Sequence, residues 1–299
     1  MDLTIVAIPA FLGLLALELV VARWKGRDIQ EARDTWTSLA MGVGSVVVGL
    51  GWAWVENPAW DASHRLALFD LGSGAWAWLG AIVGVDFAYY WFHRLHHELR
   101  VLWASHVPHH SSQRYNLSTA LRQTWTPFTA LPFYLPLAWL GFPLPLIATA
   151  HGINLLYQFW IHTELIDRLG PLEWVFNTPS HHRVHHGANV QYLDRNYAGI
   201  LIVWDRWFGT FEPERERVRY GLTKNIATSS PPSVAFHEWF AVFRDALGAG
   251  SLRDALGFLL RPPGWRPRGE GVTATDLKRS AGLTPAAPLA CGSLRGSGG

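Results

Sequence analysis

Residues 75–100 read AWAWLGAIVGVDFAYYWFHRLHHELR, so an apolar run leads directly into a histidine-rich one. Residues 75–92 carry one charge, Asp86, and approach the roughly 20 residues with which a helix crosses the hydrocarbon core of a bilayer. His93 and His97 are four residues apart, so on a helix that continues the apolar run they lie on one face. This stretch therefore predicts a membrane helix that delivers imidazoles at its end.

Three further stretches are apolar enough to enter a membrane. Residues 3–22 carry only Glu18, residues 36–55 carry no charge, and residues 126–161 contain no Asp, Glu, Lys or Arg. As one helix the last stretch would be about 54 Å long, against a bilayer core of about 30 Å. The GFPLP break at 141–145 predicts a hairpin of two short spans or a deep re-entrant pair. We expect an all-α integral membrane protein with four to five transmembrane helices.

The distribution of basic residues predicts the orientation of these helices. The loop after the first apolar stretch is basic, whereas the next loop, residues 56–74, has only Arg65. The positive-inside rule then places the first loop, and with it every histidine cluster, in the cytoplasm. We therefore expect a cytosolic, histidine-rich helical cap on either a bacterial inner membrane or the endoplasmic reticulum. The basic residues of the first loop are Arg23, Lys25, Arg27 and Arg33.

Composition predicts four parts: membrane helices over 1–92, a catalytic domain over 93–211 that includes the hairpin 126–161, an amphipathic membrane-surface region over 212–262, and a Pro/Gly/Ser-rich, disordered tail over 263–299. The end of the catalytic part, 199–211, fits a strand or an interfacial helix. The single cysteine, Cys291, excludes a disulfide scaffold and a thiolate metal site. A net charge of +2 is too small to indicate nucleic acid as a partner. Gly80 and Gly84 indicate close helix packing or, less directly, dimerisation.

Ten of the 14 histidines lie in two short windows, 93–110 and 181–186. In HVPHH and in HHRVHH one histidine is followed at +3 and +4 by two more, so three imidazoles share one helical arc and can bind one metal or supply two neighbouring metals. A structural zinc site closes with four ligands, so this many imidazoles indicates two ions. Imidazole suits Fe, Zn, Cu or Ni, and a thiolate-free site facing lipid favours iron and oxygen chemistry. The candidate ligands are His93, His97, His106, His109, His110, His162, His182, His185 and His186.

Other polar residues lie where they can support these ligands. His96 and His181 are neighbours of candidate ligands, and each either contacts a metal or stands behind a ligand. Asp86 is two turns before His93, so its carboxylate either orients an imidazole N–H or forms a hydrogen bond within the helix bundle. Glu98 is a ligand, a cofactor contact or a solvated acid. Gln158 lies one turn before His162 and faces the same way. The polar groups just after the last cluster are further supporting candidates, which a surface turn explains almost as well: Asp194, Asn196, Tyr197 and Asp205. No metal role is assigned to His64, His151 or His237.

Four stretches together resemble the fatty acid hydroxylase/sterol desaturase superfamily, with the greatest likeness to its alkylglycerol monooxygenase branch. They are DFAYYWFHRLHHE, WASHVPHHSSQRYNLSTALRQ, QFWIHTELI and NTPSHHRVHHGANVQYLDRNYAGILIVWDRWFGTF, within 86–211. The resemblance implies a membrane-embedded, non-haem di-iron enzyme whose metals are ligated by the histidines named above. It also implies O₂-dependent hydroxylation of a lipid carbon, next to the ether oxygen in that branch. His96 is extra, and Gln113 stands where the branch has an acid.

The resemblance further implies tetrahydrobiopterin as the electron donor, and Glu98 matches the acidic residue after the first histidine motif. Our hypothesis is a membrane di-iron oxygenase that hydroxylates a lipid C–H bond, and ether-lipid cleavage is one form of this reaction. The catalytic candidates are Glu98 and Asp86. Zinc is the alternative metal. An electron-donor protein is an alternative source of electrons. A second hypothesis keeps the fold and makes the chain a sterol or fatty acid desaturase or hydroxylase. A third makes it a non-catalytic metal or haem membrane protein, which would place paired histidines on facing membrane helices.

Overall fold

The structure is a computed structural model that describes residues 3–285. It is helical, and within those residues β-structure is limited to two isolated bridges, Phe176 with Leu201 and Gly187 with Tyr220. The predicted all-α class is thus confirmed. The elements are α1 (Leu3–Val6), α2 (Ile8–Trp24), α3 (Ala32–Arg65), α4 (Ala75–Glu98), α5 (Arg100–His110), η1 (Leu117–Leu121), η2 (Pro127–Ala130), α6 (Leu131–Leu140), α7 (Leu144–Ile161), η3 (Gly170–Trp174), α8 (Pro179–His185), η4 (Val190–Tyr192), α9 (Val203–Trp207), α10 (Pro231–Leu247), α11 (Leu252–Leu260), η5 (Pro267–Gly269) and α12 (Ala274–Ser280).

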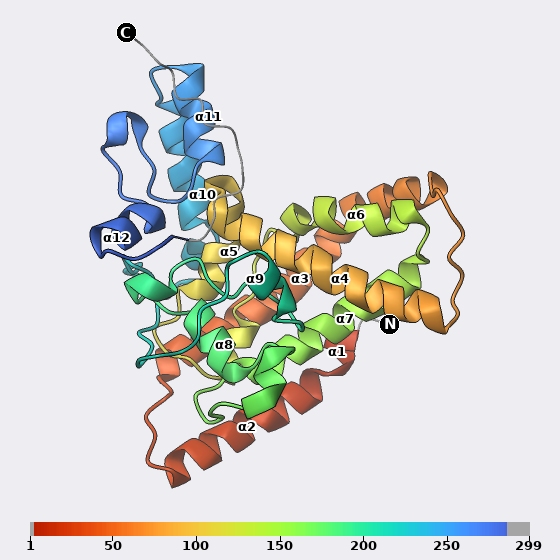
Figure 1. Ribbon diagram of the computed structural model, residues 1–299, viewed down its shortest axis with the longest axis horizontal. Coiled ribbons are helices and arrows are strands. Elements are labelled where there is room, and N and C mark those ends of the chain that lie inside the picture. Colours follow the sequence, from red (N-terminus) through yellow and green to blue (C-terminus); the bar gives the residue numbers. More distant parts are fainter. Residues whose placement is uncertain (1–2, 286–299) are drawn as a thin grey trace.

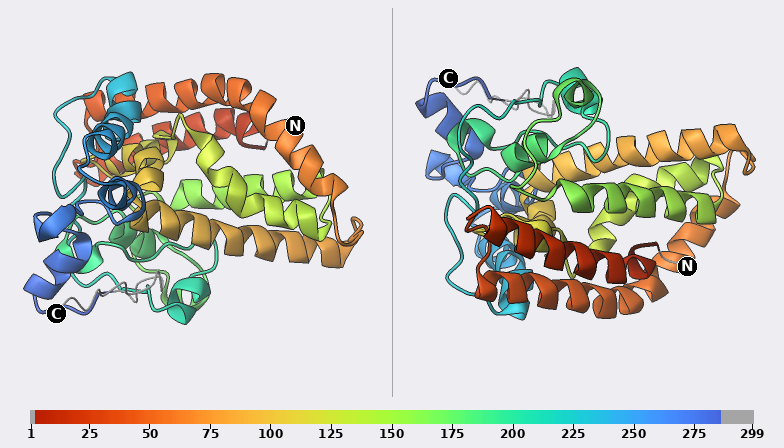
Figure 2. Two further views of the ribbon diagram at one scale, coloured as in Figure 1. Left: turned by 90° about the horizontal axis from the view of Figure 1, so that it is seen from above. Right: turned by 90° about the horizontal axis from the view of Figure 1, so that it is seen from below.

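The long helices run alongside one another toward one end of the molecule, and the short helices gather at the other end (Figures 1 and 2). Helix α4 is central, because it packs on α6 and α7 through small buried residues such as Ala77, Ala81 and Val85. A Cβ on Gly84 would meet Leu137 of α6 at 3.0 Å, and one on Gly80 would meet Phe142 at 3.1 Å. The two glycines therefore serve close packing within this chain.

The predicted hairpin is present as α6 and α7. Helix α6 ends where Gly141 adopts a left-handed conformation with φ 108°, and a Cβ there would lie 1.8 Å from the carbonyl oxygen of Phe69. Only glycine fits that position. Helix α6 has ten residues, a length of about 15 Å, so it is half as long as a bilayer core is thick.

One helix of the described residues, α3, is long and apolar enough by length and composition to cross a membrane. Its apolar side chains are exposed, for example Val47 at 64% and Trp54 at 85%. Four to five spans were expected, and this measure supports one of them. Helix α2 is short, with 17 residues, and α4 ends in a polar, histidine-bearing turn.

The segment 199–211, expected to be a strand or an interfacial helix, contains the short helix α9 and a single bridge at Leu201. The region 212–262 contains two helices, α10 and α11, that pack on α5 and on each other. Their outer face is apolar, with Phe240, Leu247 and Leu252 among the most exposed side chains.

The tail expected to be disordered is folded as far as the structure describes it. Helix α12 begins with a capping box between Thr273 and Asp276, packs against η4, and buries the side chain of Lys278. The prediction from composition was wrong for this segment, because a capped helix and the buried side chain of Lys278 fix it against η4. Residues 286–299, including Cys291, lie outside the described residues.

Candidate metal site

All nine candidate ligands meet at the end of α4 and separate into two groups. Within each group the ring nitrogens lie within 4.8 Å of one another. The first group, called the five-histidine cluster, consists of His93, His97, His106, His110 and His185. The second, called the four-histidine cluster, consists of His109, His162, His182 and His186.

Each sequence motif supplies both clusters. In HVPHH, His106 and His110 of α5 join the five-histidine cluster, whereas His109 turns to the other one. In HHRVHH, His182 and His186 join the four-histidine cluster, and His185 crosses to the first. The residues four apart stay together, because they share a helix face. The rings of His110 and His186 stack with centroids 4.4 Å apart, so the clusters are neighbours.

Facing ring nitrogens have the spacing that a shared cation would give them. The Nε2 atom of His106 lies 2.9 Å from that of His93 and 3.0 Å from that of His110. In the other cluster, Nε2 of His162 lies 2.9 Å from that of His182 and 3.2 Å from that of His109. Two nitrogens each about 2.1 Å from one metal and at right angles to each other would lie about 3.0 Å apart.

Backbone carbonyls fix the tautomers of several rings. Nδ1 of His93 donates to the carbonyl of Tyr197 at 2.7 Å, Nδ1 of His162 to that of Gln158 at 2.7 Å, and Nδ1 of His185 to that of Arg195 at 3.0 Å. A carbonyl oxygen only accepts, so these neutral rings carry hydrogen on Nδ1 and a lone pair on Nε2. Their lone pairs point into the clusters, and second partners of this kind typically orient metal ligands.

Burial disfavours the charged forms of His106 and His162. Desolvation, followed by the neighbouring imidazoles, lowers the pKa of His106 well below its usual value, and burial lowers the pKa of His162 to about 4. The buried Nε2 atoms of His97 and His186 have no hydrogen-bond partner. Converging lone pairs and unsatisfied nitrogens are costly unless a cation binds them, so the donor set fits two metal ions.

The two predicted catalytic carboxylates do not reach the clusters. Asp86 accepts hydrogen bonds from the side chains of Asn154 and Trp204 and from the backbone N–H groups of Ile200 and Leu201, at 2.7–3.0 Å. None of these donors is an imidazole, so Asp86 fastens the 200–204 segment to α4 instead of orienting His93. Glu98 pairs with Arg94 of the same helix at 2.8 Å and belongs to neither cluster.

His96 and His181 also stand outside both clusters. His96 is held between the carbonyl of Phe92 at 2.7 Å and the hydroxyl of Thr129 at 3.0 Å. Nε2 of His181 lies 3.9 Å from the Glu173 carboxylate. Both side chains are buried.

The remaining predicted supporting residues contribute in different ways. Tyr197 and Gln158 act through their carbonyls, on His93 and His162. Asp205 accepts hydrogen bonds from the N–H groups of Tyr197 and Ala198, both at 2.8 Å. These bonds hold the Tyr197 carbonyl in place. Asn196 ties the carbonyl of His181 to that of Glu212 through its side-chain amide.

The 193–196 turn makes two contacts with ligands, of which the sequence indicated the Asp194 side chain as a supporting group but not the Arg195 carbonyl. The carbonyl of Arg195 receives His185, and the Asp194 carboxylate lies 3.7 Å from Nδ1 of His97. Asp194 and Asn196 have φ values of 52° and 56°, a region that Asp and Asn tolerate better than most residues. The signal was therefore the Asp-Arg-Asn order itself, which allows a turn that aims its carbonyl inward.

Comparison with known proteins agrees with this geometry. Residues 78–210 match the fatty acid hydroxylase family, and they include all nine clustered histidines. This segment is a fatty acid hydroxylase domain. The family resemblance predicted from the histidine motifs is confirmed.

The hydroxylase domain and its flanks are also similar to individual proteins. The chain is 47% identical to alkylglycerol monooxygenase of Homo sapiens over 87% of this chain and 59% of that protein, and 48% identical to that of Danio rerio with the same coverage. It is 33% identical to the ornithine lipid hydroxylase OlsE of Rhizobium tropici over 50% of this chain and 46% of that protein. The chain thus spans 59% of the length of the first two relatives. No solved structure matches it.

Proposed function

We propose that this chain is a membrane di-iron oxygenase that hydroxylates a C–H bond of a lipid with O₂. The observation that carries the proposal is the convergence of nine imidazoles into two adjacent clusters within a fatty acid hydroxylase domain. The five-histidine cluster would hold one iron and the four-histidine cluster the other. A haem takes one or two axial histidines, so groups of five and four argue against the bis-histidine carrier.

Iron in such a site supplies the redox chemistry that activates O₂, and the protein supplies binding, orientation and electrostatics. Here the carbonyls of Tyr197, Gln158 and Arg195 hold imidazole rings with their lone pairs inward. The buried cap keeps bulk water from the ligands, since seven of the nine histidine side chains are buried and the other two, His106 and His109, are half-buried. Hydroxylation consumes two electrons and two protons for each O₂ and releases one water, so a reductant is required.

Among lipids we propose an alkylglycerol as the substrate, because the relatives of highest identity reported above are alkylglycerol monooxygenases. Hydroxylation next to the ether oxygen would give a hemiacetal, which collapses to an aldehyde and a glycerol. Tetrahydrobiopterin is then the proposed donor, with an electron-donor protein as the alternative. The similarity to an ornithine lipid hydroxylase favours a second candidate, hydroxylation of another lipid chain.

We further propose that α2, α3, α4 and the α6–α7 hairpin lie in the membrane and that the histidine end faces the cytoplasm. Exposed apolar side chains on α2 and α3 support this arrangement, as do the basic residues at the histidine end of α2 and α3. The apolar outer face of α10 and α11 would rest on the membrane surface.

The test is turnover of the purified, iron-loaded full chain with alkylglycerols, sterols and fatty acids. Each assay is run with and without O₂ and with and without reduced pterin. We expect an O₂-dependent aldehyde from alkylglycerols and none from His97→Ala, which removes one ligand. Iron-loaded protein that forms no O₂-dependent product from any lipid would contradict the proposal. Product from sterols or fatty acids alone would favour the second candidate.

A further inference from the structure

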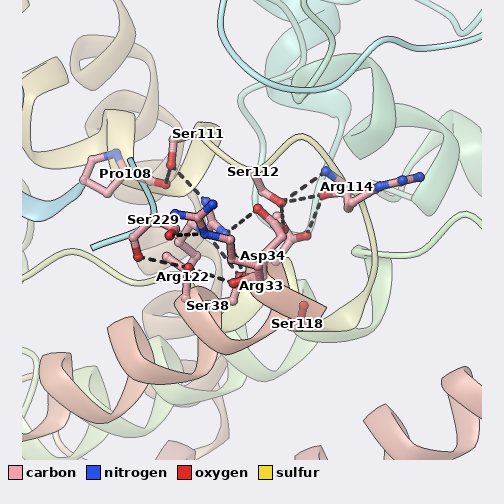
Figure 3. Close-up of polar contacts among 12 residues, drawn as sticks. Arg33, Asp34, Ser38, Pro108, Ser111, Ser112, Arg114, Ser118, Arg122 and Ser229 are labelled. Carbon is pink, nitrogen blue, oxygen red and sulfur yellow. Dashed lines mark hydrogen bonds and ion pairs between the residues drawn. The ribbon is translucent and has the colours of Figure 1, made fainter. Parts of the chain in front are cut away.

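Arg122 lies at a buried junction between the start of α3 and the end of α5 (Figure 3). Its Nη2 donates to the Asp34 carboxylate at 2.6 Å and to the Asp34 carbonyl at 2.9 Å. Its Nε donates to the Ser38 hydroxyl, and its Nη1 donates to that of Ser111, both at 3.1 Å. One guanidinium therefore ties two turns of α3 to the residue that caps α5.

The same residue reaches the four-histidine cluster through its backbone. The ring of His109 hydrogen-bonds the backbone of Arg122, which acts as the acceptor. His109 is the only ligand from α5 in that cluster, because His106 and His110 face the other one. Arg122 thus fixes both the helix end that bears His109 and the orientation of its ring.

The contacts of Arg122 suit arginine and no other residue. Arginine presents five N–H donors in a planar fork, whereas lysine offers a single ammonium. A buried guanidinium is costly unless it is paired, and Asp34 provides the counter-charge. Asp34 also accepts from the hydroxyl of Ser112, so the whole 109–112 turn is held against α3.

We propose that Arg122 is a positioning residue for the metal of the four-histidine cluster. This inference rests on the proposed function, since it requires that the clusters bind metal. The five-histidine cluster depends less on Arg122, because the rings of its ligands His93 and His185 are anchored by the carbonyls of Tyr197 and Arg195.

The test is Co²⁺ titration of the detergent-solubilised, metal-free full chain, with absorption and calorimetry as readouts. His186→Ala identifies the signal of the four-histidine cluster, because this variant loses a ligand there. We expect Arg122→Gln and Arg122→Lys to weaken Co²⁺ binding at that cluster about 10- to 100-fold, as loss of a group behind a ligand typically does. Binding at the five-histidine cluster should weaken less.

The matched control is Arg114→Gln, since Arg114 is a partly exposed arginine of the same segment whose ion pair is with Asp28. It should bind Co²⁺ like the wild type. If Arg122→Gln does not fold, Ser38→Ala removes one acceptor while Arg122 stays paired, and it should show the same selective weakening. Equal weakening at both clusters, or none in any of these variants, overturns the inference alone. A wild-type chain that binds no metal overturns the proposed function as well.

Discussion

At the scale of single residues, a histidine ring can be a metal ligand when one of its nitrogens has no other hydrogen-bond partner and points into a cluster. His97 leaves a buried Nε2 without a hydrogen-bond partner inside a cluster, whereas both nitrogens of its neighbour His96 are occupied by Phe92 and Thr129. Adjacent residues on one helix point about 100° apart, so the rings of His96 and His97 meet different surroundings.

This difference predicts opposite outcomes for the two neighbours. His97→Ala should lower the amount of bound iron below two per chain, because it removes a ligand. His96→Gln should keep two, because His96 lies outside the clusters. Metal analysis of the two purified variants measures this, and loss of iron from His96→Gln would show that the extra histidine is a ligand.

Asp205 shows that a residue can support the site without touching a ligand. It is fully buried, and besides two backbone N–H groups it accepts from the Thr210 hydroxyl at 2.6 Å. Asp205→Asn should destabilise the fold by about 1–3 kcal/mol, because the amide turns a donor toward a buried donor. Thermal unfolding of the metal-free chain measures this, with the exposed Asp167→Asn as the control. Equal stability of the two variants would contradict the assigned role.

At the scale of elements, α12 acts as a strap over the turn that carries Asp194 and Arg195. Its Lys278 donates to the carbonyl of Leu193, and burial lowers the pKa of this lysine to about 8. Between about pH 8 and the unfolded value of 10.5 the unfolded chain binds more protons than the folded one, so this group makes stability rise with pH. Below pH 8 both states are protonated and the contribution is flat.

Lys278→Met keeps an apolar side chain of similar length and removes the ammonium group that titrates. We expect this variant to lose the gain in stability that the wild type shows from pH 8 to pH 10.5. Thermal unfolding across that range measures it. The same rise in both proteins would show that Lys278 is not its source.

The elements differ in how far the sequence predicts them. The apolar run of α4, its histidine end and the break at Gly141 follow from period and turn chemistry, and all three are in the structure. The four hydrogen-bond donors to Asp86 could not be predicted from the sequence, because they lie 68 to 118 residues away along the chain. Helix α12 was missed for a related reason, since its stability comes from a buried contact with η4 and not from its composition.

At the scale of the whole molecule, the length of α4 separates the histidine site from the connection between α3 and α4. Helix α4 has 24 residues and is about 36 Å long, slightly more than the bilayer core of about 30 Å. Ser73 precedes its first turn, and His93 and His97 lie in its last turns. If α4 crosses the membrane, Ser73 and the cap lie on opposite sides.

Cysteine labelling of sealed vesicles tests this topology. In a Cys291→Ser background, Ser73→Cys and Lys224→Cys each place one thiol, and both positions are exposed. We expect an impermeant maleimide to label Lys224→Cys from the cytoplasmic side and Ser73→Cys from the opposite side. Labelling of both from one side would mean that α3 and α4 enter and leave through the same leaflet, so that the hydroxylase domain would be monotopic. Because the histidine clusters would keep their geometry in that case, the result would change the orientation of the protein in the membrane and not its chemistry.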